Sequence, residues 1–139
     1  MKGKTIDQIK VGDSETYTRT VSESDVYLFG GITGDLNPAH TNEVASAETM
    51  FKGRIVHGML TASYVSTILG MYLPGPGTIF LSSESKFLKP VRFNDTVTAK
   101  IVATDVNVEK NVVTFDAECV NQKGEKVLVG KAVVMPPRA

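Results

Sequence analysis

Two side chains that can exchange protons lie five residues apart in the segment 33–40, Thr-Gly-Asp-Leu-Asn-Pro-Ala-His. The carboxylate of Asp35 and the imidazole of His40 could hold one water molecule between them and exchange protons with it. Pro38 favours an extended conformation at Asn37 and ends any helix there. We therefore expect the two side chains to lie on either side of a turn and to point into one space.

Adding water across a C=C bond conjugated to a carbonyl requires a base for the water, an acid for the adjacent carbon and stabilisation of the enolate oxygen. Asp35 and His40 can supply the first two. The start of a helix can supply the third, because its free N–H groups and its dipole favour developing negative charge. A long apolar segment begins near Gly58, where a glycine lets a carbonyl approach the backbone. We therefore assign Gly58 to an oxyanion hole.

The same residues also have an ordinary structural interpretation. Asp-x-Asn-Pro is a common turn composition, in which Asp35 and Asn37 satisfy local N–H groups. His57 lies on the apolar segment, where a core or helix-capping histidine is expected. Cys119 lies on the apolar face of a strand and is expected in the core rather than as a nucleophile. The two histidines lack the spacing of a site such as HExxH, so no metal is expected.

Composition narrows the class of protein. The 139 residues carry 15 basic and 15 acidic side chains, so nothing points to nucleic acid or to an anionic membrane as a partner. The segment 55–73 is long enough for a membrane span, but its polar residues and glycines favour a buried helix. The chain has a single cysteine, and its N-terminal residues lack the apolar core of a signal peptide. Both features favour a cytoplasmic location. We expect one domain, residues 1–139.

Hydropathy patterns and turn residues predict one strand, then helices, then a run of strands. Short helices are expected after a capping-box motif at 22–25 and around 43–49. A long apolar helix is expected from about 56–58 to the Pro-Gly-Pro-Gly segment 74–77. Strands are expected at 14–21, 78–89, 96–108, 112–121 and 126–135. The short turns between the later strands indicate an antiparallel meander.

Five strands and only one long apolar helix favour an α+β architecture in which a curved antiparallel sheet wraps around that helix. This arrangement is the hot-dog fold. A single copy leaves a long edge strand without a partner, so pairing with a second copy is expected.

The segments 33–40 and 55–60 together resemble the MaoC-like hydratases, and specifically the short single-domain (R)-specific enoyl-CoA hydratases. The resemblance extends over nearly the whole chain and includes the helix break at 74–77 and the segment 87–95, Phe-Leu-Lys-Pro-Val-Arg-Phe-Asn-Asp. It implies a homodimeric hot-dog protein with a catalytic segment that overhangs the sheet near the dimer interface. Asn94 stands where relatives often carry glycine, but asparagine tolerates a left-handed backbone.

The resemblance also implies an activity, the reversible hydration of trans-2-enoyl-CoA to (R)-3-hydroxyacyl-CoA without a metal or an organic cofactor. The catalytic pair of the family corresponds to Asp35 and His40, and its oxyanion-hole glycine corresponds to Gly58. Its acyl-pocket positions on the central helix correspond to Ser66 and Leu69. The implied partners are an acyl-CoA substrate and a second copy of the chain, with no nucleic acid and no membrane.

Two other functions fit parts of the pattern. A hot-dog acyl-CoA thioesterase would also use a carboxylate and a helix-start oxyanion hole, but it need not place a histidine five residues after the aspartate. A non-catalytic acyl-CoA-binding module would retain the fold but has no need of both Asp35 and His40. Acyl chain length, the physiological direction and the choice of formal base stay open.

Overall fold

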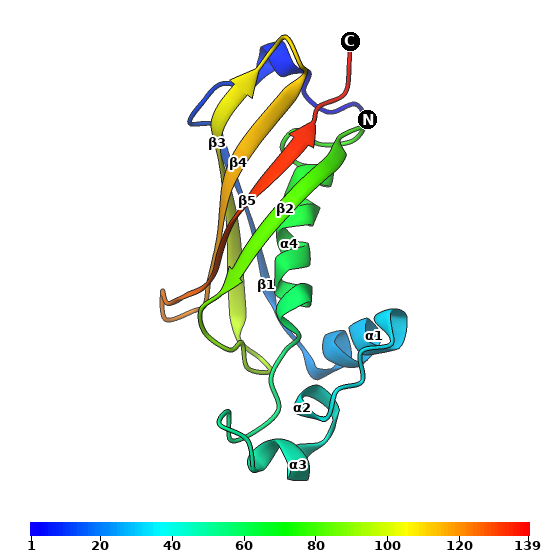
Figure 1. Ribbon diagram of the computed structural model, residues 1–139, viewed down its shortest axis with the longest axis vertical. Helices are drawn as coiled ribbons and strands as arrows, with labels where there is room; N and C mark the ends of the chain where they lie inside the picture. The colour runs from blue at the N-terminus through cyan, green and yellow to red at the C-terminus, as the bar shows by residue number, and fades with distance from the viewer.

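A five-stranded antiparallel sheet curves around one long helix in the computed structural model, which describes residues 1–139 (Figure 1). The strands are β1 Ser14–Thr20, β2 Ile79–Phe87, β3 Thr96–Asn107, β4 Val112–Val120 and β5 Lys126–Met135. The α-helices are α1 Glu23–Thr33, α2 Pro38–Thr41, α3 Glu43–Ala47 and α4 Gly58–Met71, and a 3-10 helix covers Ile6–Gln8. The predicted α+β hot-dog architecture is confirmed, with α4 as the central helix.

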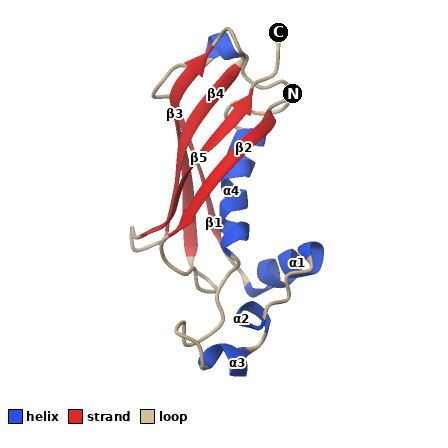
Figure 2. Ribbon diagram, in the orientation of Figure 1, coloured by secondary structure: helices blue, strands red, loops and turns tan.

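The core forms between α4 and the face of the sheet that it covers (Figure 2). Twenty-two buried apolar side chains make one cluster. Ile101 of β3 and Phe115 of β4 contribute to it from the sheet, and Ile68 contributes from α4. Burial alternates along β3 and β4, as the period-two pattern predicts, because successive side chains of a strand point to opposite faces.

The position of β2 differs from a simple meander. The strand order is β1-β3-β4-β5-β2, so β3, β4 and β5 follow one another as predicted, but β2 pairs with β5 and forms an edge. The chain therefore crosses from one edge of the sheet to its interior between β2 and β3. Hydrophobic alternation identifies a strand without identifying its partner, so the local pattern could not predict this pairing.

Helix α4 is buried on one side only, whereas its composition predicted burial nearly all round. Val65 and Ile68 are buried against the sheet, but Met59 and Met71 are more than half exposed. All nine residues of the edge strand β2 are exposed as well. No helix in the structure is both long enough and apolar enough to cross a membrane.

The chain between β1 and α4 lies beyond one end of the sheet and carries the three short α-helices (Figure 1). Helix α1 begins at the predicted capping box, in which Ser22 and Asp25 bond each other's backbone N–H groups. It continues through Gly30 and Gly31 to Thr33 and ends at Gly34, which has the left-handed conformation with φ of 82°. The overhanging catalytic segment implied by the resemblance is therefore present.

Arg54 ties this overhang together. Its guanidinium donates hydrogen bonds to Glu23 and Tyr27 of α1 and to Glu43 of α3. Its central carbon also lies 4.6 Å from the centre of the Phe93 ring. One arginine thus links two helices of the overhang to the loop that leads into β3.

Candidate active site

His40 is oriented by a one-turn helix and by one backbone hydrogen bond. Helix α2 begins at Pro38, a residue suited to the first helical position, and the Asn37 side chain accepts a hydrogen bond from Ala39 N. The His40 ring is 9% exposed, and its Nδ1 lies 2.7 Å from the carbonyl oxygen of Ile55. Because a carbonyl can only accept, Nδ1 carries the proton in this pair, and Nε2 of the neutral ring keeps a free lone pair.

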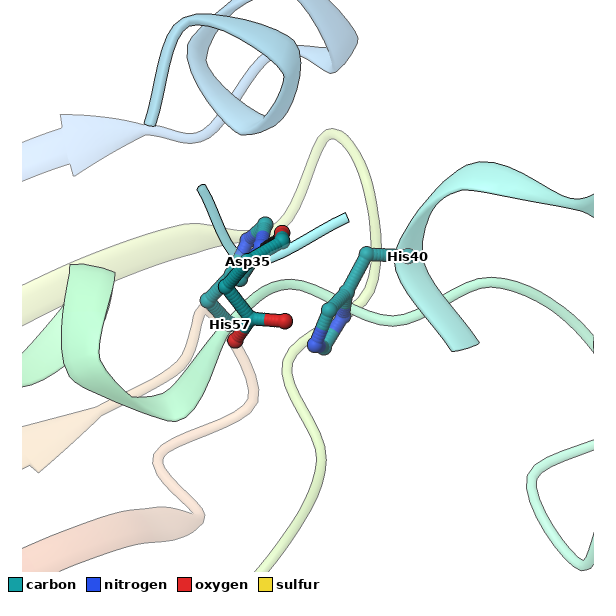
Figure 3. A group of neighbouring side chains, drawn as sticks. All are labelled: Asp35, His40 and His57. Atoms are coloured by element: carbon teal, nitrogen blue, oxygen red, sulfur yellow. Dashed lines mark hydrogen bonds between the residues drawn. The ribbon is translucent and has the colours of Figure 1, made fainter. Parts of the chain in front are cut away.

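Asp35 lies in the exposed loop between α1 and α2. Its Oδ1 accepts a hydrogen bond from Asn37 N at 3.2 Å, which is the local turn contact that the structural interpretation predicted. The carboxylate nevertheless lies beside the imidazole of His40 (Figure 3). The turn contact and a place beside the imidazole are therefore compatible, and the structure brings the two predicted acid–base groups together.

His57 joins these two residues, a role that the sequence did not predict. Its ring is 2% exposed, and Nε2 donates to the backbone carbonyl of Asp35 at 2.8 Å. The ring stacks on that of His40 with a centroid distance of 3.8 Å and an interplanar angle of 27°. His57 precedes the first residue of α4, yet its side chain makes no capping hydrogen bond. The expectation of a buried histidine is confirmed, and the expected capping bond is absent.

Asp35, His40 and His57 form the one group of potential metal ligands in the structure, with ligand atoms all within 4.8 Å of one another. The two imidazole rings are stacked, however, and the lone pairs of an imidazole lie in the plane of its ring. Nearly parallel rings do not direct their lone pairs at one ion. The arrangement therefore suits proton transfer better than metal binding.

Gly58 is the first residue of α4, and its backbone N–H has no hydrogen-bond partner in the protein. A Cβ atom at this position would lie 2.8 and 2.9 Å from two ring carbons of Phe87. The ring of Phe87, at the end of β2, thus occupies the space that a side chain would need. A glycine here was expected because it lets a substrate carbonyl approach the backbone, and the close packing of Phe87 gives a second reason.

One cavity of about 490 Å³ contains all of these groups. Asp35, His40, His57 and Gly58 line it together with apolar side chains, which include Met50, Phe51, Met59, Phe87, Leu88 and Val91. Its size is that of a small-molecule site, and a few polar groups on a mainly apolar wall are typical of such sites. A larger hollow of about 710 Å³ lies across the outer strand surface, where lysines and acids predominate, and it shares no lining residue with this cavity.

Two predicted residues lie away from this cavity. Ser66 is exposed and Leu69 is buried in the core, and neither lines the cavity of the single chain. Their assignment to the acyl pocket stays a prediction. Cys119 is fully buried in the core as expected, and burial raises the pKa of its thiol to about 12, so it is held as an unreactive thiol.

Comparison with known proteins identifies the family of the chain. Residues 8–123 match the model of the MaoC like domain. An (R)-specific enoyl-CoA hydratase of Rhodospirillum rubrum is 48% identical over 94% of this chain and 90% of its own length. A 3-hydroxybutyryl-CoA dehydratase of Methylorubrum extorquens is 38% identical over 95% of this chain and 83% of its own. An unliganded R-hydratase structure from Pseudomonas aeruginosa superposes with a TM-score of 0.92, at 34% identity, over 99% of this chain and 88% of that one. The chain belongs to the MaoC-like family.

Proposed function

We propose that this chain is a hydro-lyase that reversibly hydrates trans-2-enoyl-CoA to (R)-3-hydroxyacyl-CoA. One observation carries the proposal: the Asp35 and His40 side chains share a cavity with the unpaired N–H of Gly58 at the start of α4. The similarity to proteins named (R)-specific enoyl-CoA hydratase and 3-hydroxybutyryl-CoA dehydratase supports the same activity and an acyl-CoA substrate.

The reaction follows from the roles of these groups. The thioester oxygen accepts a hydrogen bond from Gly58 N–H, which makes the β-carbon of the enoyl group electrophilic. A water molecule held by Asp35 and His40 loses a proton to the pair as its oxygen bonds to that carbon. The resulting enolate then takes a proton from the pair at its α-carbon, so both additions occur on one face. At His40 the exchanging atom is Nε2, because Nδ1 is engaged by Ile55.

The reaction needs no metal and no organic cofactor in this scheme, because the protein groups supply the base, the acid and the oxyanion donor. The scheme uses one domain, 1–139, and the single core cluster supports that organisation. A cytoplasmic location stays a prediction. So does the part of Ser66 and Leu69 in the acyl pocket.

We further propose a homodimer built on the β2 edge. The strand β2 is exposed along its whole length and presents Ile79, Phe80 and Leu81, each more than a third exposed. An edge strand with apolar side chains favours pairing with another strand. Met59 and Met71 on the open side of α4 add to the apolar surface that a second copy would cover.

An assay with crotonyl-CoA and a longer trans-2-enoyl-CoA tests the activity. We expect loss of the conjugated double bond without release of free thiol, and a product of R configuration. Asp35→Asn and His40→Ala should each lower the rate at least about 10²-fold, as expected for acid–base groups. Asp105→Asn, at an exposed aspartate of β3, is the matched control and should leave the rate unchanged.

Other outcomes would point elsewhere. Release of free thiol would identify a thioesterase, and binding of enoyl-CoA without turnover would identify a binding module. Near-wild-type turnover in either Asp35→Asn or His40→Ala would remove that residue from the mechanism.

A further inference from the structure

We propose that His57 is a positioning residue, which fixes the Asp35 loop and the His40 ring relative to each other and to the start of α4. This inference rests on the proposed hydratase function. In the scheme above His57 does not act on the substrate. The inference is that His57 nevertheless affects the catalytic rate, in addition to packing in the core.

The contacts of His57 reach each part of the site. Its Nε2–H holds the backbone carbonyl of Asp35 at 2.8 Å, so the loop that carries the carboxylate is bonded to the residue before α4. Its ring covers one face of the His40 imidazole at a centroid distance of 3.8 Å. Since the edge of His40 is held by Ile55, the stacking leaves that ring little freedom to turn. Gly58, the proposed oxyanion donor, is the next residue in the chain.

An imidazole suits this place better than other side chains. The position needs a flat ring to stack on His40 and a donor at the far end of the ring to reach Asp35. It also favours a ring without a second N–H, because Nδ1 of His57 is buried and has no hydrogen-bond partner in the protein. A buried donor without an acceptor is costly, so the ring with a proton on Nε2 alone fits. Phe29 packs against His57 with ring centres 5.0 Å apart and supports its orientation.

The packing of α1 depends on the same contact. A Cβ atom at Gly30 would lie 3.1 Å from the backbone oxygen of Asp35 and 3.7 Å from a ring carbon of His57. The glycine therefore lets α1 lie close to the bond between these two residues. The neighbouring Gly31 has no atom within 4 Å of its Cβ position. This difference explains why α1 contains a glycine at 30 and supplies a matched control at 31.

Two substitutions separate the functions of the His57 ring. His57→Phe keeps a flat ring and removes the donor, whereas His57→Gln keeps a donor at a similar reach and removes the ring. We expect each to lower kcat for crotonyl-CoA at least about tenfold, since displacement of a reacting group by about 1 Å can cost 10²-fold. KM should stay within about threefold, and the melting temperature reports the fold. Turnover within about twofold of wild type in both variants would overturn the proposal.

A second readout does not depend on turnover. The chain has only two histidines, so the imidazole signals that remain in either variant belong to His40. In the wild type we expect ¹⁵N chemical shifts of a ring with its proton on Nδ1. Loss of His57 should move them towards the average of the two tautomers. Unchanged ¹⁵N shifts of His40 in both variants would contradict the positioning role.

A pair of glycine substitutions tests the contact from α1, even where a His57 variant does not fold. Alanine at either position favours the helix. Gly31→Ala should keep wild-type kcat, whereas Gly30→Ala should lower kcat about threefold by displacing the Asp35 carbonyl from His57 by a few tenths of an ångström. Equal kcat in these two variants would overturn the proposal. A wild-type protein that does not hydrate enoyl-CoA would instead overturn the proposed function, and the His40 spectra would then decide this inference alone.

Discussion

The variant Gly58→Ala can distinguish between two reasons for a glycine at the start of α4. One is the close packing of Phe87, and the other is the approach of the thioester to the backbone. The Cβ of Gly58→Ala would lie 2.8 Å from the nearest ring carbon of Phe87, whereas ordinary contacts begin at 3.4 Å. The ring must therefore retreat by at least about 0.6 Å, or turn on its side-chain bonds. Overpacking of this kind costs about 1–3 kcal/mol in a closed core. Phe87 is 50% exposed in the single chain and can move, so we expect about 1 kcal/mol.

The displaced ring also affects the cavity, because Phe87 and Gly58 line it together. We expect Gly58→Ala to lower kcat/KM for crotonyl-CoA about tenfold, which corresponds to about 1.4 kcal/mol of transition-state stabilisation. In a Phe87→Ala background the added methyl group meets no ring. It should then cost less than about threefold in kcat/KM and almost nothing in the free energy of unfolding.

Four proteins are needed: the wild type, Gly58→Ala, Phe87→Ala and the double variant. Steady-state kinetics and urea denaturation on each give the coupling between the two positions, which we expect to be about 1 kcal/mol in both quantities. The reasoning fails if the methyl group lowers kcat/KM by the same factor with and without the Phe87 ring. The glycine would then be required by the approach of the thioester to the backbone, as the sequence argument first held.

Three further predictions concern the overhang, the core and the edge. Arg54→Ala should lower the free energy of unfolding by about 1 kcal/mol in urea denaturation, because three linked contacts are lost but their exposed partners regain water. Arg54→Lys should recover only part of this loss, because a single ammonium does not reproduce the planar set of N–H donors of a guanidinium. Full recovery of the free energy of unfolding would contradict the role of that donor set. Burial raises the pKa of Tyr64 and of Cys119 to about 12, so the folded protein keeps protons that the unfolded chain releases. The melting temperature should therefore fall as the pH rises from about 9, where the unfolded Cys119 begins to ionise, and more steeply from about 10, where the unfolded Tyr64 does so, up to about 12. Within its own window each group contributes about 1.4 kcal/mol per pH unit. Cys119→Ala should make the fall shallower, and a profile identical to that of the wild type would refute the assignment. Phe80→Glu on the β2 edge should yield monomers in sedimentation experiments. Val108→Glu, in an exposed turn, is the control and should leave the dimer intact. A dimer that survives Phe80→Glu would place the interface elsewhere.

Local patterns in the sequence determined the elements and half of the site. The capping box at Ser22 and Asp25 started α1. Residues of high β-propensity located β1, and period-two alternation located the later strands, each within a few residues. The Asp-x-Asn-Pro turn separated Asp35 from His40 as expected, although the one-turn helix that begins at Pro38 and carries His40 was not predicted. These features depend on neighbours in the chain, on side-chain periodicity and on the restraints that proline and capping residues impose. For this reason they can be derived from sequence.

Tertiary structure alone decided which distant residues meet. The pairing of β2 with β5 joins segments that no local pattern connects, and it carries the Phe87 ring to Gly58. Likewise, His57 reaches the Asp35 carbonyl and the His40 ring only because the overhang folds back over the start of α4. Contacts of this kind arise from packing between whole elements, whose free energy depends on shape and burial rather than on spacing in the chain. The sequence therefore determined which residues could do the chemistry, and the tertiary structure decided how they are held.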